Sequence, residues 1–398
     1  MRTELNRREW LTTAGKSLAG IYLGRTLTSY ASTAPTAPVS VAKCPNYGDI
    51  LVPTLEKMFD QLGGLDRLVK GKTVAIKLNL TGNPNHRLAH LPLGQAQWVH
   101  PKIVGATVYL LGRAGARRIR LLESPMSTSE PLEEFMLAAN WEPREFLSAA
   151  SRVEFENTNY LGTAKKYTRF QVPRGGLLFS AYDLNHSYED CDVFVSIAKL
   201  KEHLTAGITL SMKNCFGITP CTIYGEAAGE DEPSLTPKGG RRLFHDGFRQ
   251  PSKCSPPEKD PSGSREGGYR VPRAVVDLVA ARPIHLAIID GIDTMTSGEG
   301  PWAPNTRPVK PGVLIAGTNC VTTDAVGTAI MGYDPMADRG ISPFETCDST
   351  LRLAEDMGLG IRDLSRIEVR GVPIPQARFN FKPYHNSPWN VEELDFRC

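Results

Sequence analysis

Three lysines, a histidine and an asparagine stand close together near the middle of the chain. They are Lys199, Lys201, His203, Lys213 and Asn214. Such a cluster can hold a carboxylate or a phosphate through charge-assisted hydrogen bonds. Crowded ammonium groups also lower one another's pKa, so one lysine could act as a neutral base or nucleophile near neutral pH. The cluster therefore favours a site for a small anion.

A plainer explanation of these lysines stays open. Glu202 and Glu226 lie close by in the sequence and can pair with them on the protein surface, where lysines usually stay solvated. In that case the lysines would have no ligand to bind.

Polar residues also follow other strands that the sequence predicts. Apolar runs bounded by turn residues predict strands at residues 73–78, 118–122, 192–198, 284–289 and 312–316. Four of these strands deliver charged or polar residues where they end, namely Lys77, Asn79, Glu123, Ser124, Lys199, Lys201, His203 and Asp290. In open α/β sheets the ligand crevice lies outside the carboxyl ends of the strands. We therefore expect these side chains to converge on one crevice.

The residue types suggest a role for each member of that crevice. The predicted substrate-binding residues are Lys77, Asn79, Lys201, Lys213 and Asn214, and the predicted catalytic residues are Lys199, His203 and Asp290. A histidine suits acid or base work because its pKa lies near neutrality. Asp290 would orient His203 or hold a metal.

Imidazole and carboxylate side chains could also bind a divalent metal ion. The candidate ligands are His100, Asp290 and Asp324, with His203 and Glu299 as further candidates. They come from separate segments and match no fixed ligand spacing, and His100 can instead cap the helix that follows it. The sequence leaves the cofactor undetermined, and a divalent metal is one candidate.

Several familiar catalytic signatures are absent. The chain contains no G-x-x-x-x-G-K-[ST], no G-x-S-x-G and no H-E-x-x-H, which argues against nucleotide hydrolysis, serine hydrolysis and zinc peptidase chemistry. Its 8 cysteines include no C-x-x-C pair. We therefore expect no iron–sulfur cluster.

Helical periodicity alternates with the predicted strands. Apolar spacing predicts helices at residues 51–62, 101–115, 324–331 and 351–357. The first helix thus precedes the first strand, residues 73–122 form one βαβ unit, and residues 152–182 contain strands or hairpins. This order predicts an α/β fold with a largely parallel twisted sheet and flanking helices.

A long irregular insertion is predicted at residues 224–270, which are rich in Gly, Pro, Ser and charge. Connections of this length are usually functional covers or disordered segments. Because Arg241, Arg242 and His245 lie inside it, we favour a cover over the active surface. An insertion without a role is the alternative.

The N-terminal residues have the order of an export signal. Asn6-Arg7-Arg8-Glu9-Trp10-Leu11 precedes a mildly apolar stretch and small residues up to Ala31, which is typical of a twin-arginine signal. We predict a signal peptide at 1–31, a linker at 32–48 and one α/β domain at 49–398, exported by the twin-arginine machinery to the periplasm or another extracytoplasmic space. An ordinary basic N-terminus is the alternative.

The net charge gives no support to nucleic-acid binding. The chain carries a formal charge of +3, which equals the excess of five basic residues over two acidic ones in the predicted signal: Arg2, Arg7, Arg8, Lys16 and Arg25 against Glu4 and Glu9. Without net positive charge in the mature chain, we expect no nucleic-acid partner. No apolar run reaches the roughly 18 residues of a membrane span, so we expect no stable span either.

Several of these motifs stand in the order seen in a known family. They are Ala75-Ile76-Lys77-Leu78-Asn79, His100-Pro101, Ser196-Ile197-Ala198-Lys199-Leu200-Lys201-Glu202-His203, Thr209-Leu210-Ser211-Met212-Lys213-Asn214-Cys215-Phe216-Gly217 with Pro220 and Tyr224-Gly225, and Asp290-Gly291. From about Val74 to Pro335 the chain resembles the family catalogued as domain of unknown function 362. The resemblance implies twin-arginine export in many members and, in some, a ferredoxin-like iron–sulfur module whose cysteines are missing here. It implies a site but no established reaction.

These features together predict an exported protein that binds a small anionic metabolite, a carboxylate or a phosphate, in a lysine- and histidine-rich crevice. If it turns the ligand over, it is an envelope enzyme. The alternative is a non-catalytic binding protein, or an accessory protein that assists maturation of a partner, because clustered lysines fit both.

Overall fold

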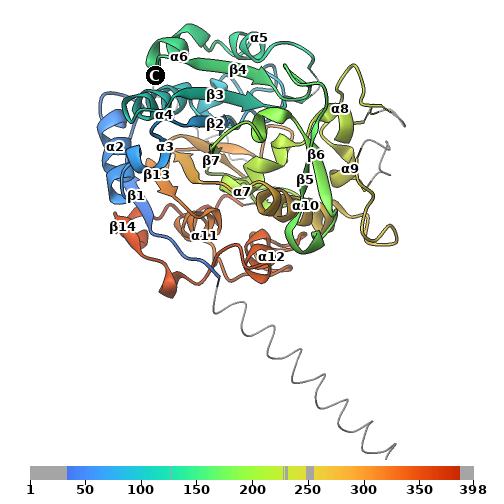
Figure 1. Ribbon diagram of the computed structural model, residues 1–398. Coiled ribbons are helices and arrows are strands. Elements are labelled where there is room, and N and C mark those ends of the chain that lie inside the picture. Colours follow the sequence, from blue (N-terminus) through green and yellow to red (C-terminus); the bar gives the residue numbers. More distant parts are fainter. Residues whose placement is uncertain (1–33, 127, 227, 229–231, 248–254, 386–398) are drawn as a thin grey trace, which may run out of the picture.

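A central sheet organises the molecule (Figure 1). The computed structural model describes residues 34–126, 128–226, 228, 232–247 and 255–385, so the predicted signal at 1–31 lies outside the described residues. In the described part, 8 strands form one sheet in the order β14-β1-β13-β10-β7-β2-β3-β4. They are β1 (Val39–Lys43), β2 (Thr73–Lys77), β3 (Arg118–Glu123), β4 (Val153–Asn157), β7 (Val193–Lys199), β10 (Leu286–Gly291), β13 (Val313–Gly317) and β14 (Val369–Gly371). Strand β13 is antiparallel to both neighbours and the other pairs are parallel, which confirms the predicted α/β class with a largely parallel sheet.

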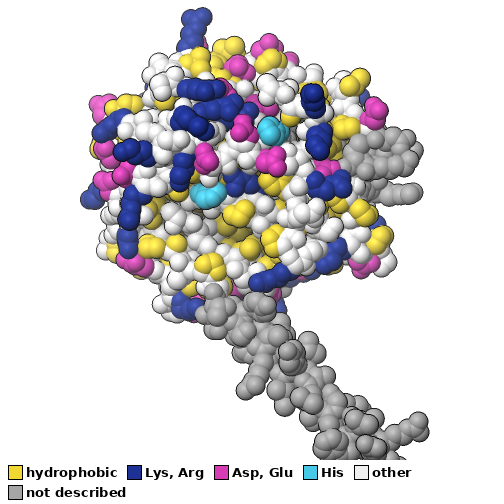
Figure 2. Space-filling model, in the orientation of Figure 1, with side chains coloured by type: hydrophobic (Ala, Val, Ile, Leu, Met, Phe, Trp, Pro, Cys, Tyr) yellow, Lys and Arg dark blue, Asp and Glu magenta, His cyan; other side chains and the backbone are white. Residues whose placement is uncertain are grey.

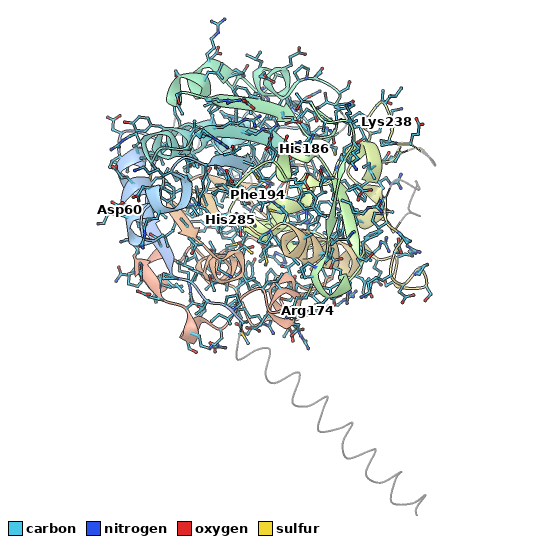
Figure 3. All side chains as sticks on the ribbon, viewed as in Figure 1. Asp60, Arg174, His186, Phe194, Lys238 and His285 are labelled. Atoms are coloured by element: carbon cyan, nitrogen blue, oxygen red, sulfur yellow. The ribbon has the colours of Figure 1, made fainter. Side chains whose placement is uncertain are left out.

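Helices cover both faces of this sheet, because alternate residues of a strand point to opposite sides. In β7, Val195 and Ile197 belong to one apolar core and Phe194 belongs to the other, and Figure 3 shows Phe194 near the middle of the molecule. The first core is completed by α2 (Leu51–Gln61), α4 (Pro101–Arg113), α5 (Leu132–Leu137) and α6 (Pro143–Ala149). The second is completed by α7 (Leu210–Asn214), α10 (Gly267–Ala281), α11 (Cys320–Ile330) and α12 (Thr350–Asp356).

Most predicted elements lie within a few residues of their expected bounds. The βαβ unit consists of β2, α4 and β3, with β2 and β3 parallel. The strands or hairpins expected in residues 152–182 are β4 and an antiparallel hairpin of β5 (Thr168–Gln171) and β6 (Ala181–Leu184). Helix α11 begins earlier than predicted because the side chain of Asn319 accepts the backbone N–H groups of Val321 and Thr322 and caps it there.

The predicted linker at 32–48 is wrong in part, and so is the expectation that the first helix precedes the first strand. Strand β1 lies inside that range, antiparallel to β13 and parallel to β14. Its Val39 and Val41 are buried in the second core. The apolar pattern of this strand is only five residues long and does not stand out among the Ala, Pro and Ser residues around it.

The described part of the predicted insertion is packed against the body of the protein. It holds the short helix α9 (Arg242–His245), and α10 begins at Gly267, just inside the predicted end of the insertion. Phe244 of α9 is buried and stacks on Tyr224 at 5.6 Å between ring centroids. The remaining short elements are α3 (Asp66–Val69), α8 (Cys221–Tyr224), α13 (Ile374–Ala377), β8 (Glu202–His203), β9 (Gly207–Ile208), β11 (Thr294–Thr296) and β12 (Arg307–Val309).

Charged side chains of both signs are interspersed over the face that Figure 2 shows. None of the helices in the described residues combines the length and the apolar character needed to cross a membrane.

Asp324 of α11 fixes the start of α7, the helix that carries Lys213. Its buried carboxylate accepts hydrogen bonds from the backbone N–H of Ser211 (2.9 Å), the Ser211 hydroxyl (2.5 Å) and the backbone N–H of Met212 (2.9 Å). We expect Asp324→Ala to lower the free energy of unfolding by about 2–4 kcal/mol in urea denaturation, because three donors lose their acceptor. Asp356→Ala, which removes an exposed carboxylate of α12, should change it by less than about 0.5 kcal/mol. Equal effects of the two substitutions would contradict this role of Asp324.

Candidate functional site

The strand order places four charged residues in a row at the carboxyl edge of the sheet. Adjacent parallel strands β10, β7, β2 and β3 carry Asp290, Lys199, Lys77 and Glu123 at or near their ends. Each lysine pairs with the carboxylate on its outer side. Lys199 Nζ lies 2.9 Å from Asp290 Oδ2, and Lys77 Nζ lies 2.7 Å from Glu123 Oε1. Residues far apart in the sequence thus meet at one edge, as expected.

The Lys199–Asp290 pair is fully buried, and neither residue lines the cavity at this edge. Lys199 Nζ also donates to the Gly94 carbonyl (2.6 Å), and Asp290 accepts the backbone N–H of His100 (3.0 Å). Burial lowers the pKa of Lys199, while Asp290 raises it. The prediction that Asp290 orients His203 is wrong, because its carboxylate pairs with Lys199. Two of the three residues predicted as catalytic, Lys199 and Asp290, form a buried structural pair instead.

Lys201, predicted to bind substrate, is also buried away from the cavity. Its Nζ donates to the Thr81 hydroxyl (3.2 Å), the Gln97 carbonyl (2.7 Å) and the Glu299 carbonyl (2.9 Å). Burial lowers the pKa of Lys201 well below its usual range. The residue therefore ties the connection between β2 and α4 to the one between β11 and β12, and the prediction of a direct ligand contact is corrected.

The three predicted metal ligands are not brought together, because Asp290 contacts only the backbone N–H of His100 and Asp324 lies on α11 against Ser211 and Met212. His100 Nδ1 accepts the backbone N–H of Lys102 (3.1 Å) and caps α4, which is the alternative to metal binding given above for this residue. Asp324 holds α7, and burial raises its pKa to about 7. In the ranges that the structure describes, no three His, Cys, Asp or Glu side chains are arranged to hold a metal ion. The predicted set is therefore wrong as a metal site.

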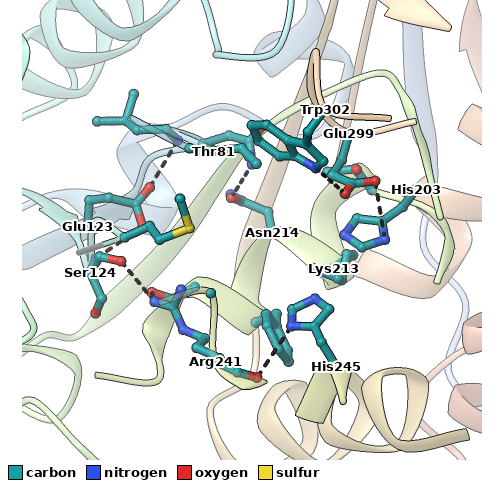
Figure 4. A pocket seen from close by; sticks show the side chains of 18 of the residues that line it. Thr81, Glu123, Ser124, His203, Lys213, Asn214, Arg241, His245, Glu299 and Trp302 are labelled. Atoms are coloured by element: carbon teal, nitrogen blue, oxygen red, sulfur yellow. Dashed lines mark hydrogen bonds and ion pairs between the residues drawn. The ribbon is translucent and has the colours of Figure 1, made fainter. Parts of the chain in front are cut away.

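A cavity of about 500 Å³ opens beside the ends of β2 and β3 (Figure 4). Five predicted site residues line it: Lys77, Asn79, His203, Lys213 and Asn214. Arg241, Arg242 and His245 of the 224–270 segment line it as well, so this part of the segment contributes to the cavity wall. From β2 the chain continues outward to β3 and β4, and it then returns to β7 on the other side of β2 and continues to β10. Ligand crevices in α/β sheets form where the strand order reverses in this way.

The Lys77–Glu123 pair forms part of the cavity wall, next to Gly217. A Cβ atom on Gly217 would lie 2.8 Å from Lys77 Nζ and 3.1 Å from Glu123 Oε1. The backbone can approach the ion pair this closely because residue 217 has no side chain. Burial lowers the pKa of Lys77, and Glu123 counteracts this.

Asn214 bridges the ends of two central strands. Its Nδ2 donates to the Ser196 hydroxyl (3.0 Å) and the Ile197 carbonyl (3.2 Å) of β7. Its Oδ1 accepts a hydrogen bond from Asn79 Nδ2 (3.0 Å), just beyond β2. The Oδ1 of Asn79 is buried without a partner among the described residues. Both amides are thus fixed at the cavity.

Lys213 differs from the other lysines of this edge. Its ammonium group makes no hydrogen bond or ion pair within the described ranges, and it lies 4.2 Å from the centroid of the Phe216 ring. Burial lowers the pKa of Lys213 to about 7, with the charges of Arg241 and Lys77 acting in the same direction and Glu299 opposing them. Near neutral pH the amine therefore exists in both protonation states.

Arg241 brings a second cation to the cavity. Its Nε donates to the Thr219 carbonyl (2.8 Å) and its Nη2 to the Ser124 carbonyl (2.8 Å). Within the described ranges no carboxylate pairs with it and its Nη1 has no hydrogen-bond partner. Its backbone is left-handed (φ 63°, ψ 54°), which costs a residue other than glycine about 1–2 kcal/mol. The bonds of the guanidinium hold this strained turn at the site.

Two histidines that line the cavity differ in which ring nitrogen carries the proton. His203 Nδ1 accepts the backbone N–H of Thr205 (3.1 Å), so the proton of the neutral ring is on Nε2. His245 Nδ1 lies 3.3 Å from the Arg241 carbonyl, which can only accept, so the Nε2 of its neutral ring is unprotonated. Burial lowers the pKa of His245 to about 4 and that of His203 well below its usual range. The two rings are nearly parallel, with centroids 6.3 Å apart.

Glu299 and Trp302 form the opposite wall. Glu299 accepts the backbone N–H of Leu204 (3.0 Å) and the indole N–H of Trp302 (2.8 Å). Burial raises the pKa of Glu299, but His203 and these two donors outweigh it and lower the value to about 2. Since His203 is neutral near pH 7, its 3.8 Å contact with Glu299 is not an ion pair there. Trp302 lines the cavity and is 45% exposed.

The alternative that Glu202 and Glu226 pair with the lysines is wrong. Glu202 is buried and accepts hydrogen bonds from Tyr333 and from His385 (2.6 Å), and Glu226 lies 3.8 Å from Arg242.

Sequence reasoning missed several lining residues, among them Thr81, Gly82, His86, Phe216, Gly217 and Trp302. Phe216 and Gly217 stand in the Lys213-Asn214-Cys215-Phe216-Gly217 motif, and Trp302 follows Gly298-Glu299-Gly300. Their positions in these short motifs were the available signal.

Comparison with known proteins decides the family. A family model described as Domain of unknown function (DUF362) matches residues 74–329. The chain belongs to this family. The matched DUF362 region contains every residue named above as lining the cavity. A thylakoid-associated protein of Synechocystis sp. is 24% identical over 305 residues, which is 75% of each chain.

Two solved structures were found in the structural comparison with this DUF362 protein. A Thermotoga maritima protein is 13% identical with a TM-score of 0.29, over 61% of this chain and 51% of that one. The lactate racemase apoprotein of Thermoanaerobacterium thermosaccharolyticum is 8% identical with a TM-score of 0.31, over 69% and 54%. The chain thus spans about half the length of either structure.

The structural role of Lys199 in this DUF362 protein predicts a stability defect. Lys199→Met should lower the free energy of unfolding by about 3–5 kcal/mol in urea denaturation, because the buried Asp290 carboxylate loses its cation. Lys199→Met/Asp290→Leu should cost less than the sum of the two single substitutions. An unchanged stability of Lys199→Met would show that the pair does not support the fold.

Proposed function

We propose that this DUF362 protein binds a small anionic metabolite in the cavity at the carboxyl edge of its sheet. The observation that carries the proposal is the presence of two cations, Lys213 and Arg241, without a carboxylate partner among the described residues. Lys77 and Lys199, by contrast, have Glu123 and Asp290. A carboxylate or phosphate would supply the missing countercharge through charge-assisted hydrogen bonds.

The two histidines favour an enzyme over a non-catalytic binding or maturation protein. Near neutral pH His245 offers a lone pair on Nε2 and His203 offers a proton on Nε2. A base and a hydrogen-bond donor thus face one cavity, and such a pair can remove a proton from a bound substrate and stabilise the negative charge that develops on an oxygen. A protein that only captures an anion needs the cations but not this pair.

The affinity for anions should fall as the pH rises through about 7, the pKa of Lys213. Its ammonium group attracts an anion below that pH and is neutral above it. Where binding requires the proton, each pH unit above the pKa weakens affinity up to about tenfold. Isothermal titration calorimetry of the mature chain from Ser32, with malonate and with inorganic phosphate between about pH 6 and about pH 9, measures this.

Matched variants make the cause of the pH dependence visible. Lys213→Met should bind malonate at least about tenfold more weakly at low pH and show no such dependence, whereas Lys213→Arg should bind at every pH. Lys166→Met, which changes an exposed lysine, is the control. Equal affinities of the native chain and Lys213→Met for both anions would contradict the proposal.

We also propose that the protein is exported in folded form by the twin-arginine machinery to the periplasm or another extracytoplasmic space, on the motif Asn6-Arg7-Arg8-Glu9-Trp10-Leu11. Arg7→Lys/Arg8→Lys should abolish the exported fraction in cell fractionation with immunoblotting. Arg25→Lys, which lies outside the motif, should leave it unchanged. Export of the double variant at the native level would contradict this route.

A further inference from the structure

Four lysines stand at the carboxyl edge, and three of their amines are already occupied. Lys77 binds Glu123, Lys199 binds Asp290, and Lys201 donates to three neutral oxygens. The Lys213 amine alone among these four lines the cavity without a hydrogen-bond partner in the described ranges. A lone pair on its nitrogen is therefore free to attack a ligand.

We propose that Lys213 forms an imine with the carbonyl carbon of a small carbonyl-bearing anion, of the 2-oxo acid class, whose carboxylate is held by Arg241. The inference rests on the proposed function, because it requires the anion to bind in this cavity. It adds the chemical class of the substrate and a covalent step.

The amine of Lys213 and the guanidinium of Arg241 both lie beside the ring of Phe216. Lys213 Nζ and Arg241 Cζ lie 4.2 Å and 5.9 Å from the centroid of one ring, that of Phe216. Lys213, Phe216 and Arg241 all line the same cavity, so one small ligand can contact both the amine and the guanidinium. A carboxylate at the free Nη1 of Arg241 would bring an adjacent carbonyl group toward the amine of Lys213, as in a 2-oxo acid.

The neighbouring imidazoles can move the protons that imine formation requires. The neutral amine adds to the carbonyl carbon, a C–N bond forms, and the carbonyl oxygen becomes an alkoxide that accepts a hydrogen bond from His203 Nε2. His245 Nε2 takes a proton from the nitrogen and passes it to this oxygen, so that both imidazoles end neutral. The resulting carbinolamine then loses its hydroxyl group, with one further proton, as water. The sum is amine plus carbonyl plus one proton, giving protonated imine plus water, and no oxidant or reductant is consumed.

The protonation state of Lys213 suits this step. Its pKa of about 7 leaves a large fraction of neutral amine at physiological pH, whereas an ordinary lysine is almost entirely protonated there. Amines desolvated in this way, next to another cation, are activated nucleophiles.

The test traps the imine by reduction. The mature chain from Ser32 is incubated with pyruvate or with glyoxylate near neutral pH, reduced with sodium borohydride, and analysed by intact mass and peptide mapping. We expect one reduced adduct per chain, at Lys213, formed at least about tenfold faster than any adduct at exposed Lys166. Its rate should rise with pH and level off above about 7, the pKa of Lys213.

Two variants separate this inference from the proposed function. Lys213→Arg should lose the adduct and still bind malonate, and Lys166→Arg should keep both. If the native chain binds malonate but carries no adduct at Lys213, imine formation is overturned and anion binding stands. If it neither binds malonate nor forms the adduct, both fail. An adduct at Lys213 without malonate binding would support the imine and limit the anion site to 2-oxo acids.

Discussion

Moving an ammonium group out of water costs several kcal/mol unless charges or hydrogen bonds replace the lost hydration. Four lysines at the carboxyl edge of the sheet are subject to this cost. For two of them the strand order supplies the compensation, because β10 places Asp290 next to Lys199 and β3 places Glu123 next to Lys77. Lys201 meets it with three neutral acceptors. The loops that supply those acceptors also form walls of the cavity.

The same constraint is left unsolved at Lys213. Its nearest described aromatic contact is Phe216, and the carboxylate of Glu299 accepts two N–H donors on the opposite wall instead of pairing with it. Arg241 adds a further cation through a strained, left-handed backbone. Strain and uncompensated charge cost stability, and they persist where function maintains them. Their coincidence at one cavity is the physical basis for placing the site there.

The sequence predicts most of the helices and strands because these elements follow from apolar alternation and helical spacing, which are local patterns. Strand β1 is the exception, since five residues in an Ala- and Pro-rich stretch carry too little pattern. The convergence at the carboxyl edge also follows from the sequence, because parallel strands end at one edge. The roles of Lys199 and Asp290 could not be predicted in this way. Which carboxylate meets which lysine depends on strand order and register, and both arise from long-range pairing.

The composition of residues 224–270 distinguishes this segment from the rest of the sequence, but the residues that it contributes to the cavity depend on tertiary packing. Arg241 and His245 enter the cavity because Phe244 anchors α9 against Phe216 and Tyr224. That packing joins residues from separate segments, and no local spacing encodes it. The proposed function depends on which cation remains unpaired among the described residues, a property of the assembled edge and not of any single motif.

The most direct test of this account is a heteronuclear NMR titration of the lysine side chains, with Lys213→Arg to assign the signal. We expect the Lys213 amine to titrate with a pKa of about 7, and we expect its NMR signal to be absent in Lys213→Arg. Titration of Lys213 near the value of a solvated lysine, about 10.4, would contradict the claim that this amine is the uncompensated group at the centre of the site.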